Sequence, residues 1–128
     1  MSVILVPFDA SQHAYKALHI ALDLSEKYKT NLVLIHVAGA TRTEENAARA
    51  AAIVSAAKKK LNHRSADAAE IEVVYGVPAE CILLAAKRFS ASTIVMGCRG
   101  ASASEESMFG SVSQEIFRRA DCTCISVK

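Results

Sequence analysis

The chain has 128 residues, a length typical of one domain that buries its own core. Apolar residues make up 52% of it and the formal net charge is +2, which excludes an intrinsically disordered chain and a strong field for nucleic acid. Its apolar runs are far shorter than the about 18 residues of a membrane span, and no basic region precedes the first strand pattern. We therefore expect a cytoplasmic protein with neither a membrane nor a nucleic acid among its partners.

The hydrophobic pattern predicts strands and helices in strict alternation. Short apolar runs without polar interruption are typical of strands buried on both faces of a parallel sheet. Between these runs, apolar residues recur every three to four positions, the period of a helix with one face on a core. The predicted elements are strand 3–6, helix 12–29, strand 31–37, helix 42–61, strand 71–75, helix 78–89, strand 93–96, helix 111–119 and strand 123–127.

Three helix starts carry the residues that cap a helix. Ser11 directly precedes the first helical pattern. Thr41 stands three residues before Glu44, and Ser111 three residues before Gln114, which is the spacing of a capping box. We expect each of these hydroxyl residues to be the N-cap of its helix.

The alternation predicts an α/β fold, a single doubly wound domain over residues 1–128 with a five-stranded parallel sheet and helices on both faces. In such sheets, ligands bind beyond the carboxyl ends of the strands, where the strand order reverses. Asp9, Val37 and Gly97 each follow or end a different predicted strand. We expect these three residues to lie near one crevice.

The cysteines and a run of lysines have simple explanations. Cys122-x-Cys124 suggests a metal site, but no His or Cys lies close by in the sequence, so we favour small buried apolar residues. The other cysteines are Cys81 and Cys98, and we expect reduced thiols throughout. The run at 58–60 resembles a nucleic-acid patch, but lysines at a helix C-terminus stabilise the helix in any case.

A glycine-punctuated connection lies between the fourth predicted strand and the last predicted helix. It begins with Gly97 and Gly100 and ends with Gly110 and Ser111. Glycines let a backbone approach a ligand closely, and a helix N-terminus favours an anion such as a phosphate. The connection lacks the Lys of a Walker A loop and the spacing of a dinucleotide fold, so these general rules point to no particular nucleotide.

The spacing of this connection resembles a family signature. The pattern G-x2-G-x9-G-[ST], filled by Gly97, Gly100, Gly110 and Ser111, is that of the ATP-binding branch of the universal stress protein family. This family has an adenine nucleotide alpha hydrolase-like fold. The similarity covers the whole chain and includes Val6-Pro7-Phe8-Asp9-Ala10-Ser11, His36-Val37, Gly76-x-Pro78, Ile94-Val95-Met96-Gly97 and Gly110-Ser111-Val112-Ser113.

The resemblance implies an ATP site, with any Mg²⁺ or Mn²⁺ carried by the phosphates. It assigns the adenosine to Asp9 and the backbone of Val37, with Pro7 shaping that wall. It assigns the ribose and phosphates to Gly97, Arg99, Gly100, Gly110, Ser111, Val112 and Ser113. The chemistry agrees, because a carboxylate accepts hydrogen bonds from a ribose and an Arg donates charge-assisted bonds to phosphate. A turn acid for Asp9 and a solvated loop charge for Arg99 are the alternatives.

The chain departs from the family pattern at a few positions. Ala10 stands where Gly is usual, Cys98 where Ser is common and Thr123 where a Pro is frequent. Glu105 and Glu106 lie within the connection that would wrap the phosphates, which they would repel unless they face water or a cation. We expect this acidic pair to alter nucleotide affinity or turnover. A redox-sensitive Cys98 is the less favoured interpretation of that residue.

The resemblance implies a nucleotide-responsive stress sensor rather than a fast enzyme. The motif offers no Lys and no base to position water, so we assign no catalytic residue, although slow hydrolysis or phosphorylation of Ser111 or Ser113 stays open. The family also implies a homodimer through the last strand, Cys124 to Val127, and a downstream protein that the sequence does not identify. The alternatives are a nucleotide-free interaction module of the same family, a phosphoacceptor receiver domain and a flavin-binding module.

Overall fold

The computed structural model describes residues 2–64, 66, 69–99 and 110–128. The strands and helices alternate strictly, as predicted. The elements are β1 (Val3–Pro7), α1 (Gln12–Tyr28), β2 (Asn31–Val37), α2 (Glu44–His63), β3 (Glu70–Val74), α3 (Pro78–Arg88), β4 (Ala91–Gly97), α4 (Ser111–Arg119) and β5 (Thr123–Val127). Among these residues no helix has both the length and the apolar character of a membrane span.

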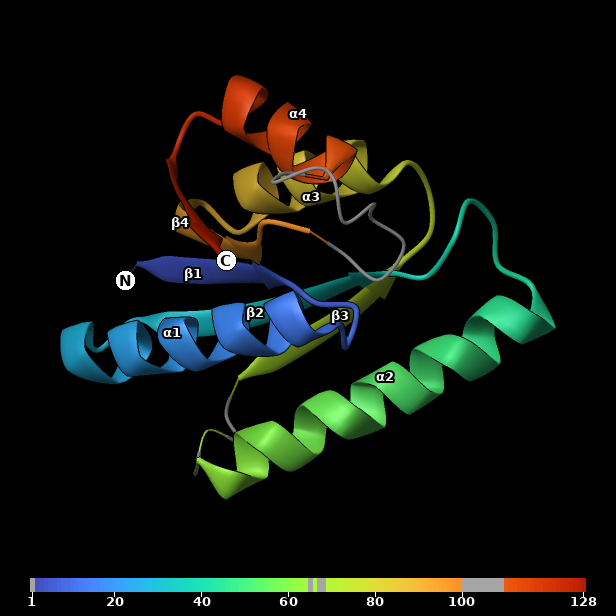
Figure 1. Cartoon of the computed structure of the whole chain (residues 1–128), viewed down its shortest axis with the longest axis horizontal. Coiled ribbons are helices and arrows are strands. Elements are labelled where there is room, and N and C mark those ends of the chain that lie inside the picture. Colours follow the sequence, from blue (N-terminus) through green and yellow to red (C-terminus); the bar gives the residue numbers. More distant parts are fainter. Residues whose placement is uncertain (1, 65, 67–68, 100–109) are drawn as a thin grey trace.

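All strand pairings are parallel, and the sheet has the order β3-β2-β1-β4-β5. Helices α1 and α2 cover one face and α3 and α4 cover the other (Figure 1). The predicted doubly wound α/β fold with a five-stranded parallel sheet is therefore confirmed. The strand order reverses between β1 and β4, so the carboxyl ends of these two central strands form the switch point where a ligand is expected.

The apolar core has one layer on each face of the sheet, because successive strand residues point to opposite faces. In β1, Ile4 and Val6 pack against α1 and α2, whereas Leu5 packs against α3 and α4. The middle residues of β1, β2 and β4 are buried, while the edge strands β3 and β5 are mostly half-buried. This gradient explains why the uninterrupted apolar runs were the clearest strand signals.

The first helix start is as predicted and the second is not. Ser11 caps α1, and its Oγ accepts a hydrogen bond from the backbone N–H of Ala14 at 3.2 Å. The N-cap of α2 is Thr43 rather than Thr41, with its Oγ1 accepting from the N–H of Asn46 at 3.0 Å. The side-chain amide of Asn46 donates to the Thr41 carbonyl at 2.8 Å, which holds Thr41 outside the helix. The Thr41 prediction was wrong because a second hydroxyl lay two residues closer to the helix.

Helix α1 ends at an exposed residue in the left-handed conformation. Lys29, its C-cap, has a φ of 56°, which a side chain with a Cβ disfavours and glycine adopts readily. We expect Lys29→Gly to raise the free energy of unfolding by about 1 kcal/mol. Urea unfolding followed by circular dichroism measures it.

Lys27→Gly is the matched control, because Lys27 lies in the last turn of α1 with helical backbone. That control should lower the free energy of unfolding by about 1 kcal/mol. The same Lys-to-Gly change at two positions, two residues apart, should thus change the free energy of unfolding in opposite directions. Equal destabilisation by both would contradict the assignment of strain to Lys29.

Candidate functional site

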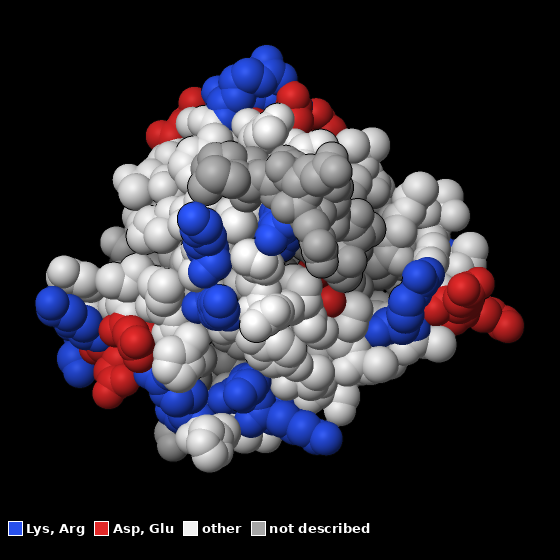
Figure 2. All heavy atoms as spheres, viewed as in Figure 1, with Lys and Arg blue, Asp and Glu red and all other residues white. Residues whose placement is uncertain are grey.

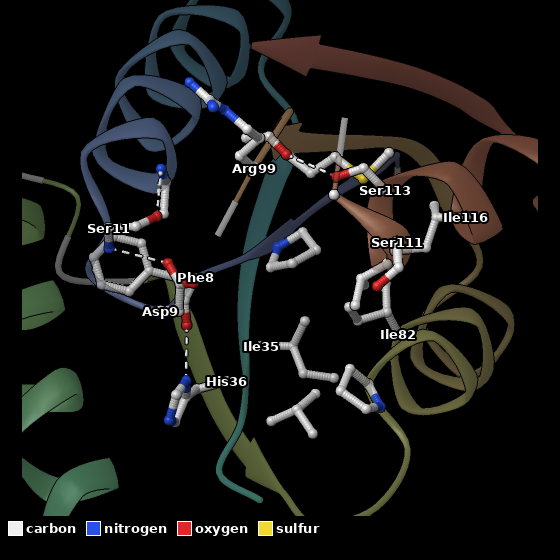
Figure 3. Close-up of a pocket in the computed structure, with 18 residues that line it drawn as sticks. Phe8, Asp9, Ser11, Ile35, His36, Ile82, Arg99, Ser111, Ser113 and Ile116 are labelled. Carbon is white, nitrogen blue, oxygen red and sulfur yellow. Dashed lines mark hydrogen bonds between the residues drawn. The ribbon is translucent and has the colours of Figure 1, made fainter. Parts of the chain in front are cut away.

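A cavity of about 390 Å³ opens at the switch point, beyond the carboxyl ends of β1, β2 and β4 (Figure 3). Asp9 and Ser111 lie on opposite sides of it (Figure 3). Gly100 lies outside the described residues, as do Glu105 and Glu106. The other residues that the resemblance assigned to ATP all line the cavity: Pro7, Asp9, Val37, Gly97, Arg99, Gly110, Ser111, Val112 and Ser113.

The cavity has an apolar half that the sequence analysis did not single out. Ile35 of β2, Ile82 of α3 and Ile116 of α4 line this half, and Met96 at the end of β4 belongs to the same apolar cluster. Ile82 could have been expected from its place on the core-facing side of a predicted helix. Its meeting with Ile116, however, depends on packing between elements distant in sequence. The lining residues that were missed are Phe8, Ser11, Ala14, Ile35, His36, Pro78, Ile82, Met96 and Ile116.

The polar half begins at the turn between β1 and α1. Asp9 Oδ1 accepts a hydrogen bond from the N–H of Ser11 at 2.9 Å, so the turn fixes the carboxylate at the cavity wall. Between them Ala10 has a φ of 62°, the left-handed conformation that explains why glycine is usual here. Asp9 is therefore a turn acid, one alternative that the sequence left open, and at the same time a residue of the cavity.

The side chain of His36, beside Asp9 in Figure 3, forms a hydrogen bond with the backbone of the turn that follows β1. Its Nδ1 lies 2.9 Å from the Phe8 carbonyl oxygen, and only 8% of the residue is exposed. A carbonyl can only accept, so Nδ1 carries the proton and donates it. This bond ties the end of β1 to β2 next to the cavity.

Two hydrogen bonds hold the start of α4 against the end of β4. The Gly110 N–H donates to the Cys98 carbonyl at 2.7 Å, and the Ser113 hydroxyl donates to the Gly97 carbonyl at 3.0 Å. We call Gly97, Cys98, Gly110 and Ser113 the neck. Ser113 is only 6% exposed, so its hydroxyl proton is committed to the neck and only its lone pairs stay open to a further donor.

Helix α4 spans the predicted residues 111–119, but the residue that caps it differs from the prediction. Its N-cap is Gly110, with a φ of −73°, and Ser111 is the first helical residue. The Ser111 prediction was wrong because Gly110 closes the first helical bond, its carbonyl accepting from the N–H of Gln114 at 3.1 Å. Among the described residues no side chain caps this end. The positive end of α4 therefore faces the cavity beside Ser111 and Val112.

Arg99 lies at the rim of the cavity, and its side chain extends toward α1 (Figure 3). The far side of α4 is fixed to α3 by Arg119, which forms ion pairs with Glu80 and, at 3.3 Å, with Glu115. The hydrogen bond from Arg119 lowers the pKa of the Glu80 carboxyl, and bonds from Arg118 and Arg119 lower that of Glu115. These exposed pairs fix the orientation of α4 more than they add stability.

The cysteines are free thiols. Cys98 is buried, with its Sγ 3.5 Å from Nδ1 of His13. In β5, burial raises the pKa of the Cys122 thiol and raises that of Cys124 to about 11, so both are protonated at neutral pH. Within the described part of the chain, no three His, Cys, Asp or Glu side chains gather as metal ligands.

Fold and cavity together define a small doubly wound α/β domain with a ligand cleft at its switch point. The chain belongs to the universal stress protein family, whose model matches residues 1–128. Universal stress protein YxiE of Bacillus subtilis (strain 168) is 30% identical to it over 146 residues, which cover 97% of each chain.

Solved structures of this family share the fold. Universal stress protein UspA from Lactobacillus plantarum superposes with a TM-score of 0.91 at 24% identity, covering 99% of this chain and 97% of that one. The universal stress protein from Archaeoglobus fulgidus in complex with dAMP gives a TM-score of 0.77 at 24% identity, covering 100% of this chain and 98% of that one. At such identities, the likeness concerns the fold.

The packing of α1 leaves no room for a side chain at Gly97. A Cβ at this position would lie 2.7 Å from the Cβ of His13 and 2.9 Å from its carbonyl carbon. We expect Gly97→Ala to lower the free energy of unfolding by about 1–3 kcal/mol, measured by urea denaturation. The double variant Gly97→Ala/His13→Ala should not recover this loss, because the clash is with Cβ and backbone atoms. Full recovery in the double variant would contradict this explanation.

Proposed function

We propose that the protein binds ATP in the switch-point cavity and acts as a nucleotide-responsive regulator in the stress response. The observation that carries the proposal is the composition of this one cavity. It joins an apolar half, a carboxylate at Asp9 and the N-terminus of α4, which no described side chain caps. An adenine nucleotide needs these three environments in sequence: apolar contact for the base, acceptors for the ribose hydroxyls and donors for the phosphates.

The base would lie in the apolar half, against Ile35, Ile82 and Met96. These side chains belong to β2, α3 and β4, so the wall is built from both sides of the switch point. Asp9 would accept a hydrogen bond from the ribose, since its carboxylate is already oriented by the Ser11 N–H. The dAMP complex of the Archaeoglobus fulgidus relative supports an adenine nucleotide as the ligand class.

The phosphates would lie at the start of α4. The first-turn N–H groups of Ser111, Val112 and Ser113 have no partner earlier in the helix and add to its positive end. Asp9 is the acidic residue among the described lining residues, and it lies across the cavity from Ser111. A Mg²⁺ or Mn²⁺ ion would therefore be carried mainly by the phosphates. It would neutralise part of their charge.

Fast hydrolysis is not expected of this cavity. Its described lining includes no Lys and a single Arg, Arg99, and its carboxylate, Asp9, lies across the cavity from Ser111 and the start of α4. Positioned cations and a group that orients water are what accelerate phosphoryl transfer. We propose that nucleotide occupancy, rather than turnover, carries the signal, with slow hydrolysis or phosphorylation of Ser111 as the remaining catalytic possibility.

A nucleotide-free interaction module is the second candidate, and two contacts favour it. Gly97 is explained by the packing of α1, and the Ser113 hydroxyl is used within the neck. Two of the residues that the resemblance assigns to the phosphates thus have a structural role without any ligand. A side chain at Gly110 should weaken nucleotide binding if the first candidate is right, and it should have no such effect on an interaction module.

Gly110→Leu separates the candidates. Gly110 has a φ of −73°, so a leucine adopts its backbone without strain and projects a side chain at the cavity lining. We expect ATP affinity to fall at least about tenfold while the melting temperature stays near that of the unmodified protein. Equilibrium titration with fluorescent ATP in the presence of Mg²⁺ measures it.

Asp121→Leu is the control, because it places the same side chain on an exposed residue beyond the other end of α4. This variant should bind ATP as the unmodified protein does. If the unmodified protein itself shows no binding up to millimolar ATP, the nucleotide proposal fails and the interaction module takes its place.

We also propose a homodimer through β5. This strand lies at the edge of the sheet, and its Cys124, Ile125 and Ser126 are only half-buried, as an unpaired edge would be. The Val127 carbonyl accepts a hydrogen bond from the Cys98 N–H at 2.8 Å, so its backbone faces β4. Because backbone directions alternate along a strand, the backbone groups of Ser126 face outward, toward a second copy.

Ser126→Pro tests this dimer. Proline removes the outward N–H and leaves the β4 side of the ladder intact, which edge strands tolerate. Light scattering coupled to size exclusion should report a dimer for the unmodified protein and for Ser126→Ala, and a monomer for Ser126→Pro. A monomer in all three at micromolar concentration would refute the dimer.

A further inference from the structure

A second hollow lies on the opposite side of the aromatic pair Phe8 and Tyr15. This groove of about 480 Å³ runs over α1, the last turn of α2 and the end of β5. It shares no described lining residue with the switch-point cavity. Phe8 lines the cavity and Tyr15 lines the groove, and their rings meet edge to face with centroids 5.1 Å apart. The two hollows are thus neighbours separated by one aromatic contact.

Positively charged side chains line the groove. Every charged side chain among its described lining residues is a cation, namely Lys16 of α1, Lys60 and Arg64 at the end of α2, and Lys128 after β5. The imidazoles of His19 and His63 lie among them. Figure 2 shows Lys and Arg side chains gathered over α1 and the C-terminal part of α2. For a chain with a net charge of +2, this is a strong local concentration.

Local helix stability explains only part of this cluster. Lys60 and His63 lie in the last turn of α2, where cations offset the negative end of the helix. Lys16 lies near the N-terminal end of α1, where that reason does not apply. Lys128 belongs to no helix. Among the described residues no carboxylate lies within ion-pair distance of Lys16, Lys60 or Lys128.

Two of the cations are held in place. Arg64 donates to Asp23 at 2.6 Å and lies 3.8 Å from Glu26, so its charge is partly neutralised and its side chain fixed at the groove edge. Lys60 Nζ lies 5.7 Å from the centre of the Tyr15 ring, a cation–π contact that directs it over the groove. The groove thus presents three lysines and an anchored arginine.

We propose that this groove is a second anion site, which binds a small ligand carrying linked phosphates. Lysines bind phosphate as compact point charges and need no planar, bidentate geometry. Several lysines around one hollow suit an anion with several charges within a short length, such as a diphosphate or triphosphate chain. A single carboxylate would leave most of these cations without a partner.

The probe is inorganic tripolyphosphate, titrated calorimetrically into the full chain at about 50 mM salt, where exposed charges are weakly screened. Lys16→Gln/Lys128→Gln should weaken binding about tenfold. The matched control Lys27→Gln/Lys87→Gln removes the same net charge outside the groove and should change the affinity less than about twofold. Equal losses in both double variants would overturn the proposal, because they would reflect net charge alone.

The switch-point cavity is tested separately with Gly110→Leu. Tripolyphosphate binding that survives this substitution supports the groove. Binding lost in Gly110→Leu and kept in Lys16→Gln/Lys128→Gln would place the anion at the start of α4 and overturn the proposal. A preference for a single-stranded oligonucleotide over tripolyphosphate would also overturn it, because the groove would then be part of a nucleic-acid surface.

Discussion

The hydrogen bond from the Gly110 N–H to the Cys98 carbonyl, together with that from Ser113 to Gly97, joins the end of β4 to the start of α4. The rest of the cavity depends on this neck. On one side, Cys98 continues the ladder with β5 through its bond to Val127, so the neck is anchored to the sheet. On the other side, it directs the positive end of α4 toward the switch point, opposite Asp9. Without the neck, the polar ends of the cavity would have no fixed separation.

The surroundings of the neck are tightly packed. Gly97 leaves no room for a Cβ beside His13, and buried Cys98 lies against the same histidine. In the turn between β1 and α1, Ala10 has a left-handed conformation that glycine would adopt at lower cost. Strained or crowded backbone is frequent where a site must be held in one geometry. Both features lie where α1 begins, so the start of α1 packs directly against the neck beside the cavity.

The sequence was sufficient for the fold because its strongest signals are local. Uninterrupted apolar runs marked the buried strands, and Ser11 marked the start of α1. The errors at Thr41 and Ser111 have one cause: each helix had an alternative N-cap within two residues, and hydrogen bonds that the sequence pattern does not reveal decided between them. Asn46 holds Thr41 in the preceding turn, and Cys98 holds Gly110 at the neck.

The candidate site was predicted in its polar half and missed in its apolar half. Glycines and hydroxyls at fixed spacing can be recognised in a sequence, whereas Ile35, Ile82 and Ile116 resemble any core residues until packing brings them to one wall. The basic groove was missed for the same reason. Lys60 was attributed to the end of its own helix, and only the fold places Lys16 and Lys128 beside it.

In the function that we propose, the switch-point cavity holds an adenine nucleotide between Asp9 and the start of α4. Nuclear magnetic resonance of the ¹⁵N-labelled protein during an ATP titration tests it most directly, because every amide of the cavity wall reports separately. We expect saturable shifts at Asp9 and Val37, on the adenosine side, together with shifts at Ser111, Val112 and Ser113 on the phosphate side. Unchanged amides at both places up to millimolar ATP would contradict it.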